Sequence, residues 1–255
     1  MNNVMLRFTD APIALKGLQR VMKHLLIVPA ERPIALAPVR SKPLRTYDPK
    51  TDAPRPEGNH VPMLLAHALE GEQEKWKVIR EGLRRYGREC GLFNDINVRR
   101  LGRSASDPFQ LMVKASGSAA NLTDVGYGVS QVLPILVDPI IAKAGQMFLM
   151  QQPEVHLHPR AQAGLGTFFG YLAKAEKKRF VIETHSDYLI DRVCLDIRDK
   201  KNGLTPDDVV ILYFQRDKSG VTIHPLTIDE AGNICGAPEG YRDFFLKEQG
   251  RLLGV

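Results

Sequence analysis

Met147-Phe-Leu-Met-Gln-Gln-Pro-Glu-Val-His-Leu-His-Pro159 is the stretch that decides the fold. It begins with four apolar residues, a short run that is typical of a fully buried strand. Polar residues and a proline follow at once, and open α/β sheets bind their ligands just beyond the carboxyl ends of such strands. A second predicted strand, Arg179 to Ile182, also ends in polar residues, Glu183-Thr-His-Ser-Asp187. The sequence therefore predicts two neighbouring strand ends that share a site.

The composition is that of an ordinary globular protein. The chain has 255 residues, of which 44% are hydrophobic and 25% charged, enough for one large or two small domains. No apolar run is long enough to span a bilayer, and no signal-peptide core is present, so we expect no membrane partner and a cytoplasmic location. Three widely spaced cysteines favour reduced thiols. The net charge of +6 permits nucleic-acid binding but is weak evidence for it.

The chain before residue 120 gives several local expectations. Residues 1 to about 30 are expected to be helical and to run into a short strand at Leu25 to Val28. The proline-rich and basic segment from Pro29 to Pro62 is expected to be extended loop. Apolar residues recur at helical spacing from Pro62 to Leu92. Asn97 to Val113 is expected to form two short strands joined by a polar turn.

The basic loop Ala37 to Tyr47 carries three cations. Arg40, Lys42 and Arg45 have the chemistry to grip phosphate, because guanidinium groups match its oxygens. Composition alone gives equal weight to a solvated basic loop, and both interpretations stay open.

A glycine pair precedes the central strand by one predicted helix. Gly126 and Gly128 leave backbone amides uncovered just before that helix begins, and such amides make an anion site together with the helix dipole. A Gly-x-Gly pair is also common in plain turns. Ser130 and Gln131 offer two more polar partners, which favours a site.

The remainder of the chain alternates helices and strands. Pro159 to Lys178 and Tyr188 to Arg198 are predicted helices, and Val209 to Phe214 with Val221 to His224 is a predicted hairpin. A polar tail leads to a final helix. We therefore expect an α/β fold, a mostly parallel sheet flanked by helices, with a small β-rich C-terminal appendage.

Three ordered motifs give a specific resemblance. Asp124-Val-Gly-Tyr-Gly-Val-Ser-Gln-Val-Leu-Pro134, Gln152-Pro-Glu-Val-His-Leu-His-Pro159 and Glu183-Thr-His-Ser-Asp187 together resemble the C-terminal half of the ABC-type AAA ATPases. This group includes the SMC proteins and the overcoming-lysogenization-defect nucleases. The Ala37 to Tyr47 loop and the tail from Asp229 to Tyr241 resemble a bacterial branch of predicted ATPases with its own C-terminal extension. The resemblance covers most of the chain from about residue 36.

The resemblance implies a role for each motif. Gly126, Gly128, Ser130 and Gln131 would lie in the signature loop, which in these ATPases reaches the γ-phosphate of ATP bound to the other subunit of a dimer. Phe148 to Gln152 would be the Walker B strand. His185 would be the switch histidine, and His156 and His158 would lie in the dimer loop. Gln152 is a catalytic candidate, and Gln151 would bind nucleotide and act as a weak Mg²⁺ ligand. Glu154 and Glu183 are the nearest carboxylates that could substitute for the missing acid, and Glu154 joins the catalytic candidates.

Two departures limit this expectation. No Gly-x-x-x-x-Gly-Lys-Ser/Thr loop, which would cradle the phosphates and help bind Mg²⁺, occurs in the 255 residues. We therefore expect the chain to be a C-terminal portion whose phosphate-loop lobe is missing. Gln151 and Gln152 are neutral amides where this branch usually has glutamate and glutamine, and an amide cannot accept a proton at neutral pH. ATP hydrolysis by this chain alone is expected to be absent.

Two other kinds of site are less favoured. Glu154, His156 and His158 alternate in a way that suits metal ligands, but no Cys or His at finger spacing supports zinc, and packing in an inter-subunit loop is preferred. His185, Ser186 and Asp187 resemble parts of a hydrolase triad. We reject a triad, because no Gly-x-Ser-x-Gly elbow holds a nucleophile.

The sequence thus gives two hypotheses. In the first, the chain is a lobe of a dimeric ATPase that uses ATP and Mg²⁺ once a phosphate-loop lobe completes it, and it gates an effector or acts on DNA, with anti-phage defence as the role suggested by analogy. In the second, it is a non-hydrolysing interaction module that binds a protein or nucleic acid. We divide the chain into an N-terminal segment (1–115), an ATPase lobe (116–215) and a C-terminal extension (216–255).

Overall fold

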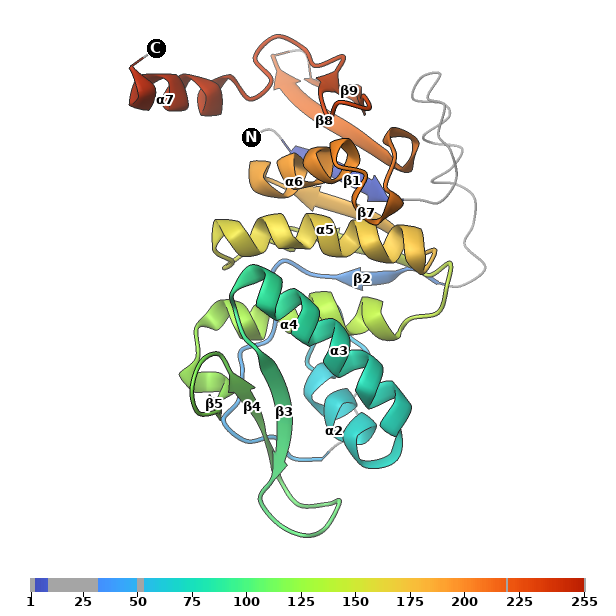
Figure 1. The fold of residues 1–255 in the computed structure, drawn as a ribbon, viewed down its shortest axis with the longest axis vertical. Coiled ribbons are helices and arrows are strands. Elements are labelled where there is room, and N and C mark those ends of the chain that lie inside the picture. The colour runs from blue at the N-terminus through green and yellow to red at the C-terminus, as the bar shows by residue number, and fades with distance from the viewer. Residues whose placement is uncertain (1–2, 9–31, 50–52, 219, 255) are drawn as a thin grey trace.

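The computed structural model describes residues 3–8, 32–49, 53–218 and 220–254 (Figure 1). Among these residues one sheet has the strand order β10-β9-β8-β1-β7-β6-β2 and a smaller sheet the order β3-β4-β5. The strands are β1 (Asn3–Phe8), β2 (Ile34–Leu36), β3 (Asp95–Arg100), β4 (Phe109–Lys114), β5 (Ala120–Asn121), β6 (Met147–Gln151), β7 (Arg179–Thr184), β8 (Val209–Asp217), β9 (Gly220–Ile228) and β10 (Ile234–Cys235). The α-helices are α2 (Val61–Gly71), α3 (Gln73–Cys90), α4 (Tyr127–Ile141), α5 (Pro159–Ala175), α6 (Asp187–Arg198) and α7 (Asp243–Leu253).

Strands β2, β6 and β7 form the parallel part of the large sheet. Leu36 pairs with Met150, and Gln151 pairs with Glu183, so these strands end at the same edge. The neighbouring strands β1, β8, β9 and β10 extend the sheet by antiparallel pairing. The α/β class, with a parallel sheet flanked by helices and an antiparallel β appendage, is confirmed. Parallel pairing is confined to three of the described strands, so the sheet as a whole is mixed.

Helices α5 and α6 pack side by side along the large sheet (Figure 1). Phe148 of β6 and Phe180 of β7 stack with ring centroids 5.5 Å apart, and Phe169 of α5 lies 5.0 Å from Phe180. All three side chains are fully buried. Burial of side chains of this size stabilises the fold by roughly 1.5–3 kcal/mol each. This aromatic cluster fixes β6 and β7 against α5, and hence fixes the relation between the two strand ends.

Most local expectations are confirmed, with three corrections. The helical segment from Pro62 to Leu92 is two helices, because Glu72 has φ −129° and ψ 64° and breaks the first. The expected loop after Pro29 contains the short strand β2. Residues 3–8 are strand β1 and not helix, since they pair with β7 and β8. The expected strand at Leu25 to Val28 lies outside the described residues.

Strands β1 and β2, both from the predicted N-terminal segment, pair within the large sheet with strands from later in the chain. The proposed boundaries at residues 115 and 215 remain a prediction. Within the described ranges, no helix combines the length and the apolar character that crossing a membrane requires.

Candidate functional site

The carboxyl ends of β2, β6 and β7 lie at one edge of the sheet, as parallel pairing requires. The β6–β7 ladder continues one residue past β6, because the Gln152 backbone N–H donates to the Glu183 carbonyl at 2.8 Å. The exposed Gln151 side-chain amide lies 3.5 Å from a carboxylate oxygen of Glu183, the long limit of a hydrogen bond. The two predicted strand ends are therefore neighbours in space.

Glu154 joins the turn after β6 to the end of β7. Its Oε1 accepts a 2.8 Å hydrogen bond from the backbone N–H of His185. The side chain is only 7% exposed, and its Oε2 is buried without a hydrogen-bond partner among the described residues. A buried carboxylate oxygen without a hydrogen-bond partner costs free energy.

Arg40 brings the end of β2 to the same turn. Arg40 is 3% exposed, and its guanidinium lies 3.5 Å from the carbonyl oxygens of Gln152 and Pro153. Burial lowers the pKa of Arg40 to about 10, against the opposing effects of Glu154 and Tyr127. The group therefore stays protonated at neutral pH. A fixed positive charge lies beneath the turn, and its Nε is also buried without a partner in the described part of the chain.

The turn after β6 contains two residues in the left-handed region. Gln152 has φ 45° and His156 has φ 68°. A non-glycine residue in this region costs of order 1–3 kcal/mol, and such residues concentrate at functional sites. Arg40 and Glu154 hold this turn in place through the contacts described above.

The N-terminus of α4 packs on the same turn. A Cβ added to Gly128 would lie 2.6 Å from the His156 carbonyl oxygen, so this position requires glycine. The rings of Tyr127 and His156 meet edge to face at 4.9 Å. Gly126, the residue before the helix, is exposed, and a Cβ there would meet nothing within 4 Å. The glycine pair thus has one member packed against the turn and one open to an approaching group.

The two polar residues that follow are occupied inside the chain. The Ser130 hydroxyl donates to the Tyr127 carbonyl at 2.7 Å, within the first turn of α4. Gln131 is 1% exposed, and its amide donates to the Ser41 carbonyl at 3.1 Å. In this structure Gln131 anchors the basic loop to α4.

The three histidines of the predicted site are exposed. His185 follows β7, and its backbone N–H is held by Glu154. His158 caps the N-terminus of α5, where its Nδ1 accepts from the Arg160 N–H at 3.4 Å. In the part of the chain that the structure describes, no three His, Cys, Asp or Glu side chains are grouped to hold a metal ion.

The cations of the basic loop have separate environments. Arg40 is buried, and Arg45 makes a two-pronged salt bridge with Asp124, two residues before Gly126. The Arg45 carbonyl also accepts from the Asn121 amide at 2.9 Å. Lys42 is exposed. Neither interpretation of this loop anticipates that Arg40 is internal, because its position among prolines gives no signal for burial.

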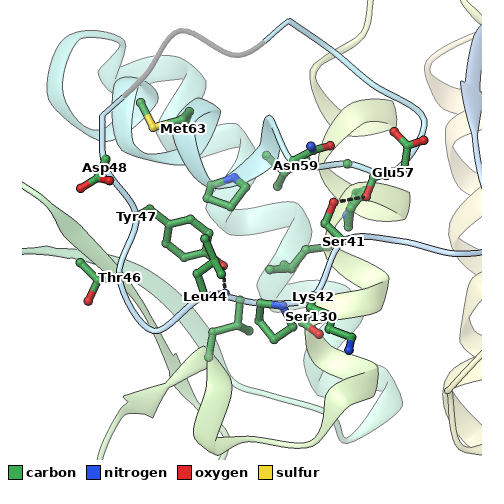
Figure 2. A pocket seen from close by; sticks show the side chains of 17 residues that line it. Ser41, Lys42, Leu44, Thr46, Tyr47, Asp48, Glu57, Asn59, Met63 and Ser130 are labelled. Carbon is green, nitrogen blue, oxygen red and sulfur yellow. Dashed lines mark hydrogen bonds between the residues drawn. The ribbon is translucent and has the colours of Figure 1, made fainter.

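A pocket of about 380 Å³ lies between this loop, α2 and α4 (Figure 2). Ser130, on α4, is among the residues that line it. Leu133 and Pro134 contribute apolar surface from the same helix, and Lys42 and Glu57 contribute charge. Sequence motifs do not predict this pocket, because its walls come from segments that are far apart in the chain.

The strand ends and the α4 N-terminus lie together at one edge of the sheet. Gly126 is open, the helix behind it has 15 residues, and the Arg40 charge lies under the adjacent turn. Exposed amides at a helix N-terminus favour phosphate. Gln151 adds an exposed side-chain amide at the same edge.

Comparison with known proteins identifies the family. A family model described as "AAA domain, putative AbiEii toxin, Type IV TA system" matches residues 41–191, more than half of the chain. A solved structure described as "Structural biochemistry of ATP-driven dimerization and DNA stimulated activation of SMC ATPases" is 10% identical, with a TM-score of 0.43, and the match covers 70% of this chain and 94% of that one. No curated protein sequence matches significantly. The chain belongs to the AAA-domain family of putative AbiEii-type toxins, a family of P-loop ATPases.

Proposed function

We propose that the chain supplies the signature, Walker B and switch-histidine half of a composite ATP site. The observation that carries this proposal is the convergence at one sheet edge of three parallel strand ends and the α4 N-terminus. Family membership supports nucleotide use in general.

In this proposal each segment has a defined task. The exposed residue Gly126 faces the γ-phosphate of a nucleotide that is bound mainly by another lobe. Gly128, Ser130 and Gln131 follow it at the start of α4 and complete the signature loop. Gln151 and Gln152 take the Walker B positions, with Gln151 as a weak Mg²⁺ ligand. His185 stands at the adjacent strand end. Bound ATP supplies the phosphoanhydride bond whose cleavage drives the cycle.

The side chains present give weak general-base chemistry. Gln151 and Gln152 cannot accept a proton at neutral pH. Glu154 carries a carboxylate, but one of its oxygens is committed to the His185 N–H and the side chain is buried. Its principal effect is to position His185. This supports the proposal that the chain does not hydrolyse ATP alone.

A second lobe is therefore part of the proposal. A polypeptide with a Gly-x-x-x-x-Gly-Lys-Ser/Thr loop would supply the phosphate cradle, in a homodimer or a heteromeric partner, and His156 and His158 would lie in the dimer loop. Nucleotide-dependent pairing would control an effector protein or an activity on DNA, in the cytoplasm and in defence against phage.

The alternative proposal, a non-hydrolysing interaction module, is favoured by one observation. The Gln151–Gln152 pair has no charge, and Glu154 is engaged by backbone. In that case the strained turn and the glycine pair would serve assembly with a partner protein and not phosphate chemistry.

Titration with ATP, with and without Mg²⁺, separates the two proposals. It should be performed on the purified chain and on the chain assembled with a phosphate-loop polypeptide of the same family. The composite-site proposal predicts Mg²⁺-dependent binding in the assembly that is tighter than the binding by the phosphate-loop polypeptide alone. Equal binding with and without this chain would support the interaction module.

A further inference from the structure

Positive charge is concentrated in one part of the chain. Residues 73–114 contain ten Lys and Arg residues against five Asp and Glu residues, an excess of five positive charges, whereas the whole chain carries +6. This segment comprises α3, β3 and β4. These three elements therefore account for almost all of the net charge of the molecule. The site at the carboxyl ends of β2, β6 and β7 lies elsewhere.

The structure gathers several of these charges around a surface hollow. Arg84, Arg88, Asn94, Asp95 and Lys114 line a depression of about 350 Å³ where the end of α3 meets the start of β3 and the end of β4. Arg88, Asn94 and Lys114 are exposed. We call these five residues the basic patch.

One carboxylate holds two guanidinium groups at the patch. Asp95 receives hydrogen bonds from Arg80 at 3.0 and 2.6 Å and from Arg84 at 2.9 and 2.9 Å. Partial burial raises the pKa of Asp95, but the hydrogen bonds and charges of the two arginines outweigh it and lower the pKa below its usual value. Asp95 therefore holds Arg80 and Arg84 in position, and its single negative charge does not neutralise both of them. Arg88 and Lys114 line the same hollow and add two further positive charges to it.

The outer face of the small sheet extends the patch. Along β3 the side chains of Ile96 and Val98 are buried, whereas Asn97 and Arg99 are exposed on the opposite face. Arg99 lies about 13 Å from Asp95, at roughly 3.3 Å per residue. That length corresponds to about four base pairs of duplex at roughly 3.4 Å each. The β3–β4 hairpin extends away from the large sheet (Figure 1), and its tip carries the exposed Arg103.

The acidic neighbours leave the patch net positive. Glu81 lies one turn before Arg84 on α3. The hydrogen bond to Asp95 and, to a smaller extent, the negative charge of Glu81 raise the pKa of Arg84. Arg88, a further turn along, shares the hollow with Lys114, and Asp95 is the one carboxylate among the residues that line it. Phosphate contact is therefore expected at Arg88 and Lys114, with Arg84 held by Asp95 beside them.

We infer that the basic patch and the adjoining outer face of β3 bind the phosphate backbone of a nucleic acid. Guanidinium and ammonium groups spaced along a polar sheet face match a repeating phosphodiester, and no base-reading element is required. This inference does not rest on the proposed nucleotide site, and it can be tested without ATP.

The test is fluorescence anisotropy with a short labelled DNA duplex and the full chain, without nucleotide. The double variant Arg88→Gln, Lys114→Gln removes two contacts and should reduce the slope of log K against log salt by about two. Between about 50 and about 200 mM salt, wild-type affinity should therefore fall roughly tenfold more than that of the variant.

A matched control removes the same charge elsewhere. The variant Lys247→Gln, Arg251→Gln on α7 changes the net charge by the same amount, and both residues are exposed. Helix α7 lies at the opposite end of the structure from the β3–β4 hairpin (Figure 1). It should retain the wild-type slope. Equal losses in both variants, or no duplex binding at low salt, would overturn the inference. Inorganic phosphate at duplex-equivalent concentration should not displace the DNA; full displacement would indicate a single-anion site and also overturn it.

Discussion

Arg40 and Glu154 are buried opposite charges that hold the functional turn. Each has one polar atom without a partner among the described residues, and Glu154 raises the pKa of Arg40 against the larger effect of burial. Removal of one member of a buried charged pair leaves the other uncompensated, which typically costs about 3–5 kcal/mol. Arg40 follows β2 and Glu154 follows β6, two strands that are paired through their backbones.

At this scale we predict a non-additive effect on stability. Arg40→Met and Glu154→Gln should each lower the free energy of unfolding by about 3 kcal/mol, and the double variant should lose clearly less than the sum. Urea unfolding of all four proteins measures this cycle. Arg198→Met, at an exposed arginine on α6, should change stability by less than about 0.5 kcal/mol. Strict additivity of the first two variants would show that the charges act independently.

The α4 N-terminus places two glycines in opposite situations. Gly128 abuts the His156 carbonyl, whereas Gly126 faces open space. Gly128→Ala should destabilise the protein by about 1–3 kcal/mol through overpacking, whereas Gly126→Ala should leave stability within about 0.5 kcal/mol of wild type. Thermal unfolding compares the pair. If Gly128→Ala were as stable as wild type, α4 would not pack on the turn as described.

Helix α3 is attached to β3 by the Asp95 cluster, which gives a pH prediction. Because the folded-state pKa of Asp95 lies below its usual 3.8, the carboxylate contributes stability above about pH 4 and loses it as pH falls toward the lowered value. Asp95→Asn should therefore be less stable than wild type at about pH 7, and the difference should shrink as the pH falls below about 4. Unfolding measured across this range tests it. A constant difference would contradict the ion-pair assignment.

The elements differ in how far sequence can predict them. The strands β6 and β7 have apolar runs bounded by polar residues, and their pairing places Gln151 beside Glu183 as expected. For β1 the sequence wrongly predicts helix, because a short apolar run does not distinguish the two and its pairing partners lie far along the chain. The burial of Arg40 is equally hidden, since it depends on contact with residues 152 and 153.

At the scale of the whole molecule, the two proposed sites lie on separate surfaces. The strand-end site lies at one edge of the large sheet, and the basic patch lies on the smaller sheet and α3. Family membership supports nucleotide use in general, and Gly126 is open at the first surface. We propose that this edge is half of a nucleotide site and is inactive alone.

ATP turnover tests that claim most directly. The purified chain alone should show none, whereas the chain assembled with a phosphate-loop polypeptide of its family should show turnover that His185→Ala abolishes. His67→Ala, at an exposed histidine on α2, should leave that turnover unchanged. Turnover by the chain alone that requires His185, or turnover by the assembly that is indifferent to His185, would contradict the composite site.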